Sequence, residues 1–378
     1  MGKVKGRRRL GLIMILLMIC LLVSPYVAWM LQDTKTLDVV ILDNTVPDMK
    51  YREHKGLMWV LNYYKYEHSQ HGSYRYDEDY YGFFPLPDYT YEIQLMPDIP
   101  DTADLVYIAD SYGVYTEEFY GENLEGRRSE LIYGGMYAYD LDKVENAVGR
   151  GIPLVAEFNT FGSPTTGGAR ERLYDLLKVE WTGWIGRYFF DLTEGVEVPV
   201  WVVWNYEQQY GELWEYHGPG FVFADENDRI VVLTVPDEAT SDACRIHFTE
   251  EGQDFFSINP QTRYNYWFDI ITLREPARMY AEFKLSLTEA GAEELAMFGI
   301  PSVFPAVVFQ DSGTYWSFYF AGDFVDIDTV PGFYKLYGYD SFKRLFTSDR
   351  GIDENNGFYW HVYVPLVRRI LDYTFDAT

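Results

Sequence analysis

Residues 151–160 read GIPLVAEFNT, a short apolar run that ends in polar residues. Two earlier stretches have the same form: 37–43 reads LDVVILD and 104–110 reads DLVYIAD. Continuous apolar runs of this length are typical of strands buried on both faces of a parallel sheet. Apolar residues at helical spacing follow each run, in 56–66, 141–148 and 173–177. This alternation predicts an α/β fold with a doubly wound parallel sheet.

The hydrophobic pattern of the sequence changes after about residue 199. Short β-like runs separated by turn residues predict strands at 200–204, 220–224, 230–233, 246–248 and 266–273. A helix at 288–298, strands at 303–309 and 315–320, and mixed character at 357–375 complete the chain. Residues 68–100, rich in Tyr, Asp and Pro, look like a surface excursion. We therefore expect an α/β domain over 37–199, a β-rich insertion over 200–300 and a return to the α/β domain over 301–378.

The N-terminus carries an uncharged apolar run, residues 10–31, preceded by five basic residues within 1–9. About 20 apolar residues span a hydrocarbon core of roughly 30 Å, and basic flanks stay in the cytoplasm. We expect 1–9 to be a cytoplasmic tail, 10–31 a single transmembrane anchor, and the rest extracytoplasmic. A cleaved signal peptide is disfavoured because Tyr26-Val27-Ala28 is a poor cleavage site. A lipid-modified Cys20 is disfavoured because the bulky Ile19 precedes it.

Charge and cysteine content restrict the partners and cofactors. The chain has 31 Lys+Arg, and removing the five of the tail leaves 26 against 58 Asp+Glu, a net charge of −32. So acidic a surface disfavours nucleic acid and anionic lipid headgroups. Cys20 lies in the predicted span and Cys244 beyond it, so no disulfide is expected within the domain. No cofactor and no metal site are expected; the loop motif His68-x-x-His71 is attributed to chance.

Aromatic residues are abundant, with 34 Tyr, 25 Phe and 10 Trp. Many fall in predicted loops, such as 74–76 and 80–84. Tyr and Trp stack on sugar rings as well as they pack in cores. Glycan contact and ordinary burial are both open interpretations.

The strands that end at Asp43 and Asp110, together with 151–160, resemble the class I glutamine amidotransferase-like (flavodoxin-like) superfamily. Residues 319–324, YFAGDF, are similar to a late strand of membrane-associated and sugar-related members. Active members place a nucleophilic Cys in a sharp turn after the third strand, which here falls on Glu157 or Phe158. His361 is followed by Val362-Tyr363 where the family pattern has an acid two residues on. The resemblance therefore implies a catalytically degenerate member without thiolate chemistry.

Polar residues follow each predicted parallel strand. Ligands of open α/β sheets bind at the carboxyl ends of the strands, so these residues are the candidate site. They could bind a cation, hold sugar hydroxyls or form an acid/base pair; alternatively, each acid caps the following helix. The catalytic candidates are Glu157, Asp110 and Asp323; the binding candidates at the strand ends are Asp43, Asn44, Ser111, Asn159 and Thr160.

Residues 181–187, WTGWIGR, supply two further binding candidates, Trp184 and Arg187. A tryptophan beside an arginine could form a stacking platform with an ion-pairing fork. The same residues could instead form a tight aromatic turn in which Arg187 pairs with Asp191.

Three functional hypotheses remain open on this basis. The first is a degenerate domain that binds a cell-envelope glycan or a partner protein. The second is a carboxylate-dependent hydrolase acting on a glycan, which requires two carboxyls about 5–10 Å apart in an open cleft. The third is a structural component of a membrane assembly.

Overall fold

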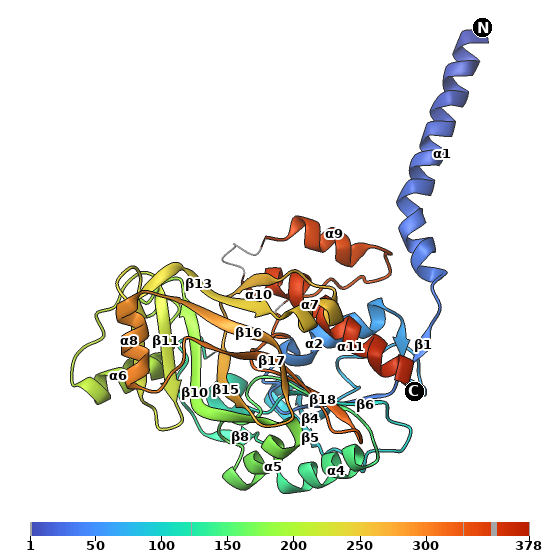
Figure 1. Ribbon diagram of the computed structural model, residues 1–378. Helices are drawn as coiled ribbons and strands as arrows, with labels where there is room; N and C mark the ends of the chain where they lie inside the picture. The colour runs from blue at the N-terminus through green and yellow to red at the C-terminus, as the bar shows by residue number, and fades with distance from the viewer. Residues whose placement is uncertain (1, 122, 328, 349–353, 378) are drawn as a thin grey trace.

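A ten-stranded mixed sheet runs through the body of the protein (Figure 1). The structure is a computed structural model that describes residues 2–121, 123–327, 329–348 and 354–377. Five parallel strands form the centre of the sheet, in the spatial order β4 (Tyr81–Leu86), β2 (Val39–Asp43), β6 (Leu105–Asp110), β9 (Leu154–Ala156) and β18 (Trp316–Phe320). Antiparallel strands extend both edges: β5 (Thr90–Gln94) beside β4, and β17 (Val303–Asp311), β16 (Arg278–Leu287), β13 (Ala239–Phe248) and β14 (Gln261–Tyr264) beyond β18.

The strand order fixes where a crevice can form. Taken in chain order, the five parallel strands are arranged 2-1-3-4-5 across the sheet, because β4 lies on one side of β2 and β6 on the other. The chain therefore leaves the carboxyl ends of β2 and β6 in opposite directions. A crevice outside the strand ends is expected at such a switch point.

Helices lie on both sides of the central strands in Figure 1, with α4 and α5 on one side and α2 and α11 on the other. Their bounds are α2 (Arg52–Tyr63), α4 (Ala138–Gly149), α5 (Gly167–Leu177), α7 (Glu250–Phe256), α10 (Glu354–Phe358), η2 (Tyr359–Tyr363) and α11 (Val364–Ala377). The chain is thus a mixed α/β protein, as the alternating pattern predicts.

A second, four-stranded antiparallel sheet packs beside the first. It has the order β12 (Ile230–Thr234), β11 (Gly220–Asp225), β10 (Val179–Phe189) and β15 (Phe268–Leu273). Helices α6 (Val200–Tyr210) and α8 (Glu289–Met297) accompany it. The remaining small elements are β1 (Lys35–Thr36), β3 (Tyr66–Glu67), η1 (Pro87–Tyr89), β7 (Val114–Tyr115), α3 (Thr116–Tyr120), β8 (Leu131–Tyr133) and α9 (Tyr339–Phe346).

Three segments differ from the sequence-based predictions. Residues 68–100 include β4, a strand of the parallel core, so they are more than a surface excursion. Residues 200–204 begin helix α6 instead of forming a strand. Residues 181–187 lie within β10 instead of forming a turn, with a bulge next to Gly183.

Helix α1 (Gly2–Met30) projects away from the body, with its N-terminus at the far end (Figure 1). The 20 residues Gly11–Met30 are long and apolar enough to cross a membrane. Within them, the 18-residue stretch that meets the requirement for a membrane span has no residue buried in the body. One such helix near an N-terminus fits either a membrane anchor or a signal sequence. Met1, and the side chains of the rest of the expected basic tail, lie outside what the structure describes.

Candidate functional site

Two aspartates meet at the switch point. Asp43 and Asp110 end the neighbouring strands β2 and β6 and are Cα partners. Both carboxyls bond to Thr45: Asp43 Oδ1 accepts from its amide at 2.8 Å and Asp110 Oδ1 from its hydroxyl at 2.6 Å. Burial raises the pKa of Asp110 to about 7, and the charge of Asp43 adds to the rise.

The local geometry of both acids is the Asx turn. Each carboxyl accepts from the amide two residues ahead, Asp43 from Thr45 and Asp110 from Tyr112. The N-cap of the helix that follows β2 is Tyr51, whose side chain makes no capping bond. The interpretation of Asp43 and Asp110 as helix caps therefore does not apply.

His54, in the first turn of α2, completes this network. Its Nδ1 lies 2.5 Å from Asp43 Oδ2 and its Nε2 lies 2.7 Å from the Tyr76 carbonyl oxygen. A carbonyl can only accept, so Nε2 carries a proton. The Asp43–His54 bond therefore holds a second proton, as an imidazolium–carboxylate or an imidazole–carboxylic acid pair. Both residues are fully buried.

The sharp turn after β9 carries Asn159 in the left-handed region, with φ 64°. Asn tolerates this conformation better than most residues. Asn159 Nδ2 donates to Asp110 Oδ2 at 3.2 Å, and its carbonyl accepts from Ser111 Oγ at 3.1 Å. Asn159 thus links the turn after β9 to the end of β6.

Two other predicted residues next to these strands, Asn44 and Thr160, are buried and donate hydrogen bonds to backbone carbonyls. Asn44 donates from Nδ2 to the carbonyl of Gly135 at 3.0 Å, whereas its buried Oδ1 has no hydrogen-bond partner. Thr160 Oγ1 donates to the Glu157 carbonyl at 2.6 Å. The structure therefore brings Asp43, Asn44, Asp110, Ser111 and Asn159 close together at the strand ends.

Glu157 points into the core under the helices instead of into an open crevice. Its side chain is 1% exposed. Oε1 accepts from the hydroxyls of Tyr107, in a very short bond, and of Tyr363, at 3.4 Å. Burial raises the pKa of Glu157 to about 8, although these bonds and the Val325 amide oppose the rise. An acid enclosed in this way has no direct access to a ligand.

Asp323, after β18, belongs to a separate acidic group with Glu53 and Asp326. One carboxylate oxygen from each lies within 4.8 Å of the others. Burial and the charges of Asp326 and Asp323 hold the pKa of Glu53 well above its usual range. Such a triad could hold a cation, since opposite oxygen ligands of Ca²⁺ lie about 4.6–5.2 Å apart. However, Arg52 already contacts Glu53 and Asp326 at 3.4 and 3.3 Å, so the triad alone does not require an ion.

Trp184 and Arg187 lie on opposite faces of β10, since an odd separation along a strand reverses the side. Trp184 is buried, edge-on to Phe298 at 6.0 Å between ring centroids, and so lies under the segment after α8. Arg187 lies 4.7 Å from the ring of Tyr266, whose hydroxyl donates to Asp326 at 2.8 Å. Arg187 therefore approaches the acidic group, whereas Trp184 does not.

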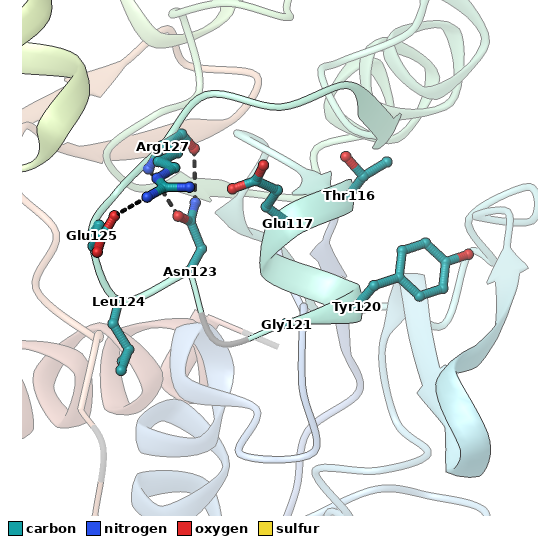
Figure 2. A pocket seen from close by; sticks show the side chains of 8 residues that line it. All are labelled: Thr116, Glu117, Tyr120, Gly121, Asn123, Leu124, Glu125 and Arg127. Atoms are coloured by element: carbon teal, nitrogen blue, oxygen red, sulfur yellow. Dashed lines mark hydrogen bonds and ion pairs between the residues drawn. The ribbon is translucent and has the colours of Figure 1, made fainter.

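An open cavity of about 640 Å³ lies along the chain that leaves the end of β6. Figure 2 shows its lining: Glu117 on α3 faces Asn123 and Arg127, and Tyr120 extends from the other side of α3. The Tyr120 ring lies 6.4 Å from that of Tyr89, and both are exposed. The remaining lining residues are Thr116, Gly121, Leu124 and Glu125.

Arg52 acts electrostatically on both Asp326 and helix α3. Glu118 of α3 is largely desolvated, which raises its pKa, and the charge of Arg52 acts against that rise. Arg52 exposes 38% of its side chain. It therefore lies between the buried acids and the exposed helix α3.

Several residues of this region carry no sequence-based prediction. Arg52, Glu53 and His54 were detectable as a charged triplet at the start of the helix after β2, which must begin at the carboxyl edge of the sheet. Asp269 is a buried acid that accepts from the Tyr319 hydroxyl, and burial raises its pKa to about 7. The cavity residues show no motif.

No protein-family profile matches the chain, and no curated protein matches it in sequence. Among solved structures, a β-galactosidase from Bacillus circulans sp. alkalophilus is similar at 10% identity and TM-score 0.35, over 77% of this chain and 30% of that one. A ThuA-like protein from Parabacteroides merdae ATCC 43184 has 10% identity and TM-score 0.36, over 76% and 79% of the two chains. The carbohydrate deacetylase Agd3 has 9% identity and TM-score 0.31, over 76% and 30%.

The chain spans less than a third of the length of the β-galactosidases to which it is similar. Likenesses at these TM-scores are too distant to assign a family, an activity or a substrate.

Proposed function

We propose that this chain is a membrane-anchored, extracytoplasmic protein that binds a cell-envelope glycan in the cavity beside α3. Its amidotransferase-like domain is proposed to be catalytically degenerate and doubly wound. The observation that carries the proposal is the cavity itself, an open space lined by carboxylates, an amide, a guanidinium and a tyrosine.

An anchor is favoured over a cleaved signal because the end of α1 is part of the folded body. Trp29 is buried and donates from Nε1 to the Tyr63 carbonyl at 2.8 Å. The amide of Tyr337 donates to the Pro25 carbonyl at 3.0 Å. A helix that packs in this way stabilises the domain, whereas a signal peptide leaves it.

Loss of thiolate chemistry is favoured by the position of Cys244. It is fully buried in β13, and burial raises the pKa of its thiol far above the usual range. A thiol in that state is a poor nucleophile. Glu157 and Phe158 stand where the resemblance places the nucleophile, and neither is a cysteine.

Glycan binding is favoured by the chemistry and the size of the cavity. Ligand sites typically have volumes of roughly 300–1,000 Å³ and a few convergent polar groups. Glu117 offers carboxylate acceptors for hydroxyl groups. Asn123 holds the turn that lines the cavity, because its Nδ2 and Oδ1 both bond to the backbone of Arg127, and the Arg127 guanidinium is paired with Glu125. On the other side of α3, Tyr120 and Tyr89 offer exposed ring faces on which a neighbouring sugar ring of an oligosaccharide can stack. Asp88 and Tyr89 both have positive φ, 63° and 56°, in the hairpin turn that presents the Tyr89 ring.

The test is a glycan array probed with the full chain in lipid nanodiscs. We expect binding to one class of oligosaccharide, and Tyr120→Ala and Glu117→Ala should each weaken it by tenfold or more, about 1.4 kcal/mol. Trp204→Ala is the matched control, because Trp204 is an equally exposed aromatic on α6. Binding that is lost equally in the control, or no binding to any glycan, would contradict the proposal.

A carboxylate-dependent glycan hydrolase is the second candidate. It is favoured by the pKa of Asp110, about 7, beside Asp43 and the proton held between Asp43 and His54. It is disfavoured by the burial of all three groups. Release of reducing sugar from an oligosaccharide identified on the array, abolished by Asp110→Asn with binding intact, would establish hydrolysis in place of binding alone.

A further inference from the structure

Helix α9 (Tyr339–Phe346) presents two chemically different faces. Its inner face is fixed to the body: Asp340 is buried and accepts from the hydroxyls of Tyr63 and Tyr64 at 2.8 and 2.9 Å. Its outer face carries Phe342, Leu345 and Phe346, with Leu345 78% exposed. Three large apolar side chains exposed together on one face are unfavourable in water, and patches of this kind mark interaction sites.

The charged residues of α9 lie on its inner face. Arg344 pairs with the buried Asp340 at 3.4 Å, and the Lys343 ammonium lies 5.3 Å from the centroid of the Trp360 ring. The outer face is therefore left apolar, although the chain as a whole is strongly acidic, with a net charge of −27. Amphipathic helices with Phe and Leu on one face lie in membrane interfaces.

The preceding loop ties α9 to the end of α1. Phe333 stacks on Tyr26 with ring centroids 6.3 Å apart, and the Tyr337 amide donates to Pro25. Pro25 lies five residues before the end of α1, which is about 7.5 Å along the helix axis. This loop therefore rises beside the last turns of α1, at the level where aromatic residues gather at a membrane surface.

Figure 1 shows the consequence for the orientation of α9. It lies on the side of the body from which α1 rises, and it runs across the direction of α1. A bilayer crossed by α1 would have its surface roughly perpendicular to α1. In that arrangement α9 lies along the surface, with its outer face toward the lipid.

We infer that α9 is a membrane-surface helix, with Phe342, Leu345 and Phe346 inserted in the outer interface of the bilayer that α1 spans. The inference rests on the anchor proposed above and extends it to the orientation of the domain. Insertion is favoured because it removes three large apolar side chains from water, and the anchor already holds the domain beside the surface.

The test uses nitroxide labels on the full chain in phosphatidylcholine vesicles that contain one quarter phosphatidylglycerol. A label on the native Cys20 reports whether α1 is in the bilayer, because Cys244 is fully buried. A label on Leu345→Cys, in a Cys20→Ser background, reports α9. A label on Leu213→Cys is the matched control, since Leu213 is an equally exposed leucine near α6.

The readout is the collision rate of each label with oxygen, which concentrates in lipid, relative to a nickel chelate, which stays in water. We expect the ratio at Leu345 to exceed that at Leu213 several-fold and to approach that at Cys20. A lipid-like ratio at Cys20 with a water-like ratio at Leu345 would overturn the inference and leave the anchor intact. A water-like ratio at Cys20 would overturn the anchor itself. Shielding of Leu345 from both agents, with spin–spin broadening that grows with protein density, would identify a second copy as the occupant and also overturn the inference.

Discussion

Replacing Glu157 by Gln tests whether this acid is the enclosed, protonated group that the geometry implies. Raising a carboxyl pKa from 4.5 to about 8 corresponds to at most about 5 kcal/mol, at roughly 1.4 kcal/mol per tenfold change. Between these two pH values the folded chain keeps a proton that the unfolded chain releases. The free energy of unfolding therefore falls as the pH rises from about 4.5 to about 8, and the loss is complete above that.

Glutamine is neutral throughout this range, so the variant lacks this component of the pH dependence. Its amide N–H group faces the place where Glu157 Oε2 has no hydrogen-bond partner, which costs about 1–3 kcal/mol. We expect the variant to be less stable than the wild type at pH 5 and more stable at pH 9. Urea unfolding of the full chain in detergent micelles, followed by tryptophan fluorescence, measures both values.

The matched control is Glu92→Gln, because Glu92 is exposed on β5. It should shift the stability by less than about 0.5 kcal/mol at either pH. If Glu157→Gln changes the stability by the same amount at pH 5 and pH 9, Glu157 is not an enclosed, protonated acid and the description of its contacts with Tyr107 and Tyr363 is wrong.

Three further predictions follow from the same contacts. His54→Ala leaves the buried Asp43 carboxyl without its partner. It should lower the free energy of unfolding, measured in urea, by about 3–5 kcal/mol. A loss below about 1 kcal/mol would show that the Asp43–His54 hydrogen bond does not form. Neither the wild type nor Cys244→Ser should release ammonia from glutamine, and the serine should only lower the stability; ammonia release that the substitution abolishes would refute the degenerate site. Protease added to intact cells without an outer barrier should digest the body and spare residues 2–9, whereas full protection of the body would reverse the proposed topology.

The buried strands were predictable because their apolar runs are continuous, and strand β4 was not because its sequence is interrupted. Gly82 and Pro85 lie within it and argue locally against a strand. Gly82 has φ 126°, and a Cβ there would lie 1.9 Å from the Asp43 carbonyl oxygen. The glycine is thus required by the close approach of β4 to β2, a tertiary fact that the local pattern does not contain.

The first residues of helix α6 were wrongly predicted to form a strand. Its opening residues, Val200–Trp204, are β-branched and aromatic, which favours a strand by propensity. Propensity is a weak preference, and burial of Val202, Val203 and Tyr206 at helical spacing outweighs it. The signal for a helix was present in Pro199, which precedes it at the N-cap.

The candidate site was also predictable only in part. Residues at the strand ends were predictable from topology alone, because carboxyl ends of parallel strands share one edge. The direction of each side chain was not, so Glu157 and Trp184 were expected at the crevice although both are enclosed by packing. The cavity depends on how residues 116–127 fold over the edge, which no spacing of residue types encodes.

The location of the ligand is the most direct test of the proposed function. An oligosaccharide that binds on the array would carry a photoreactive diazirine, be crosslinked to the full chain in nanodiscs and be mapped by mass spectrometry of peptides. We predict that the crosslinks fall within residues 116–127 and disappear with excess unlabelled oligosaccharide. Competed crosslinks confined to any other part of the chain would contradict a glycan site beside α3.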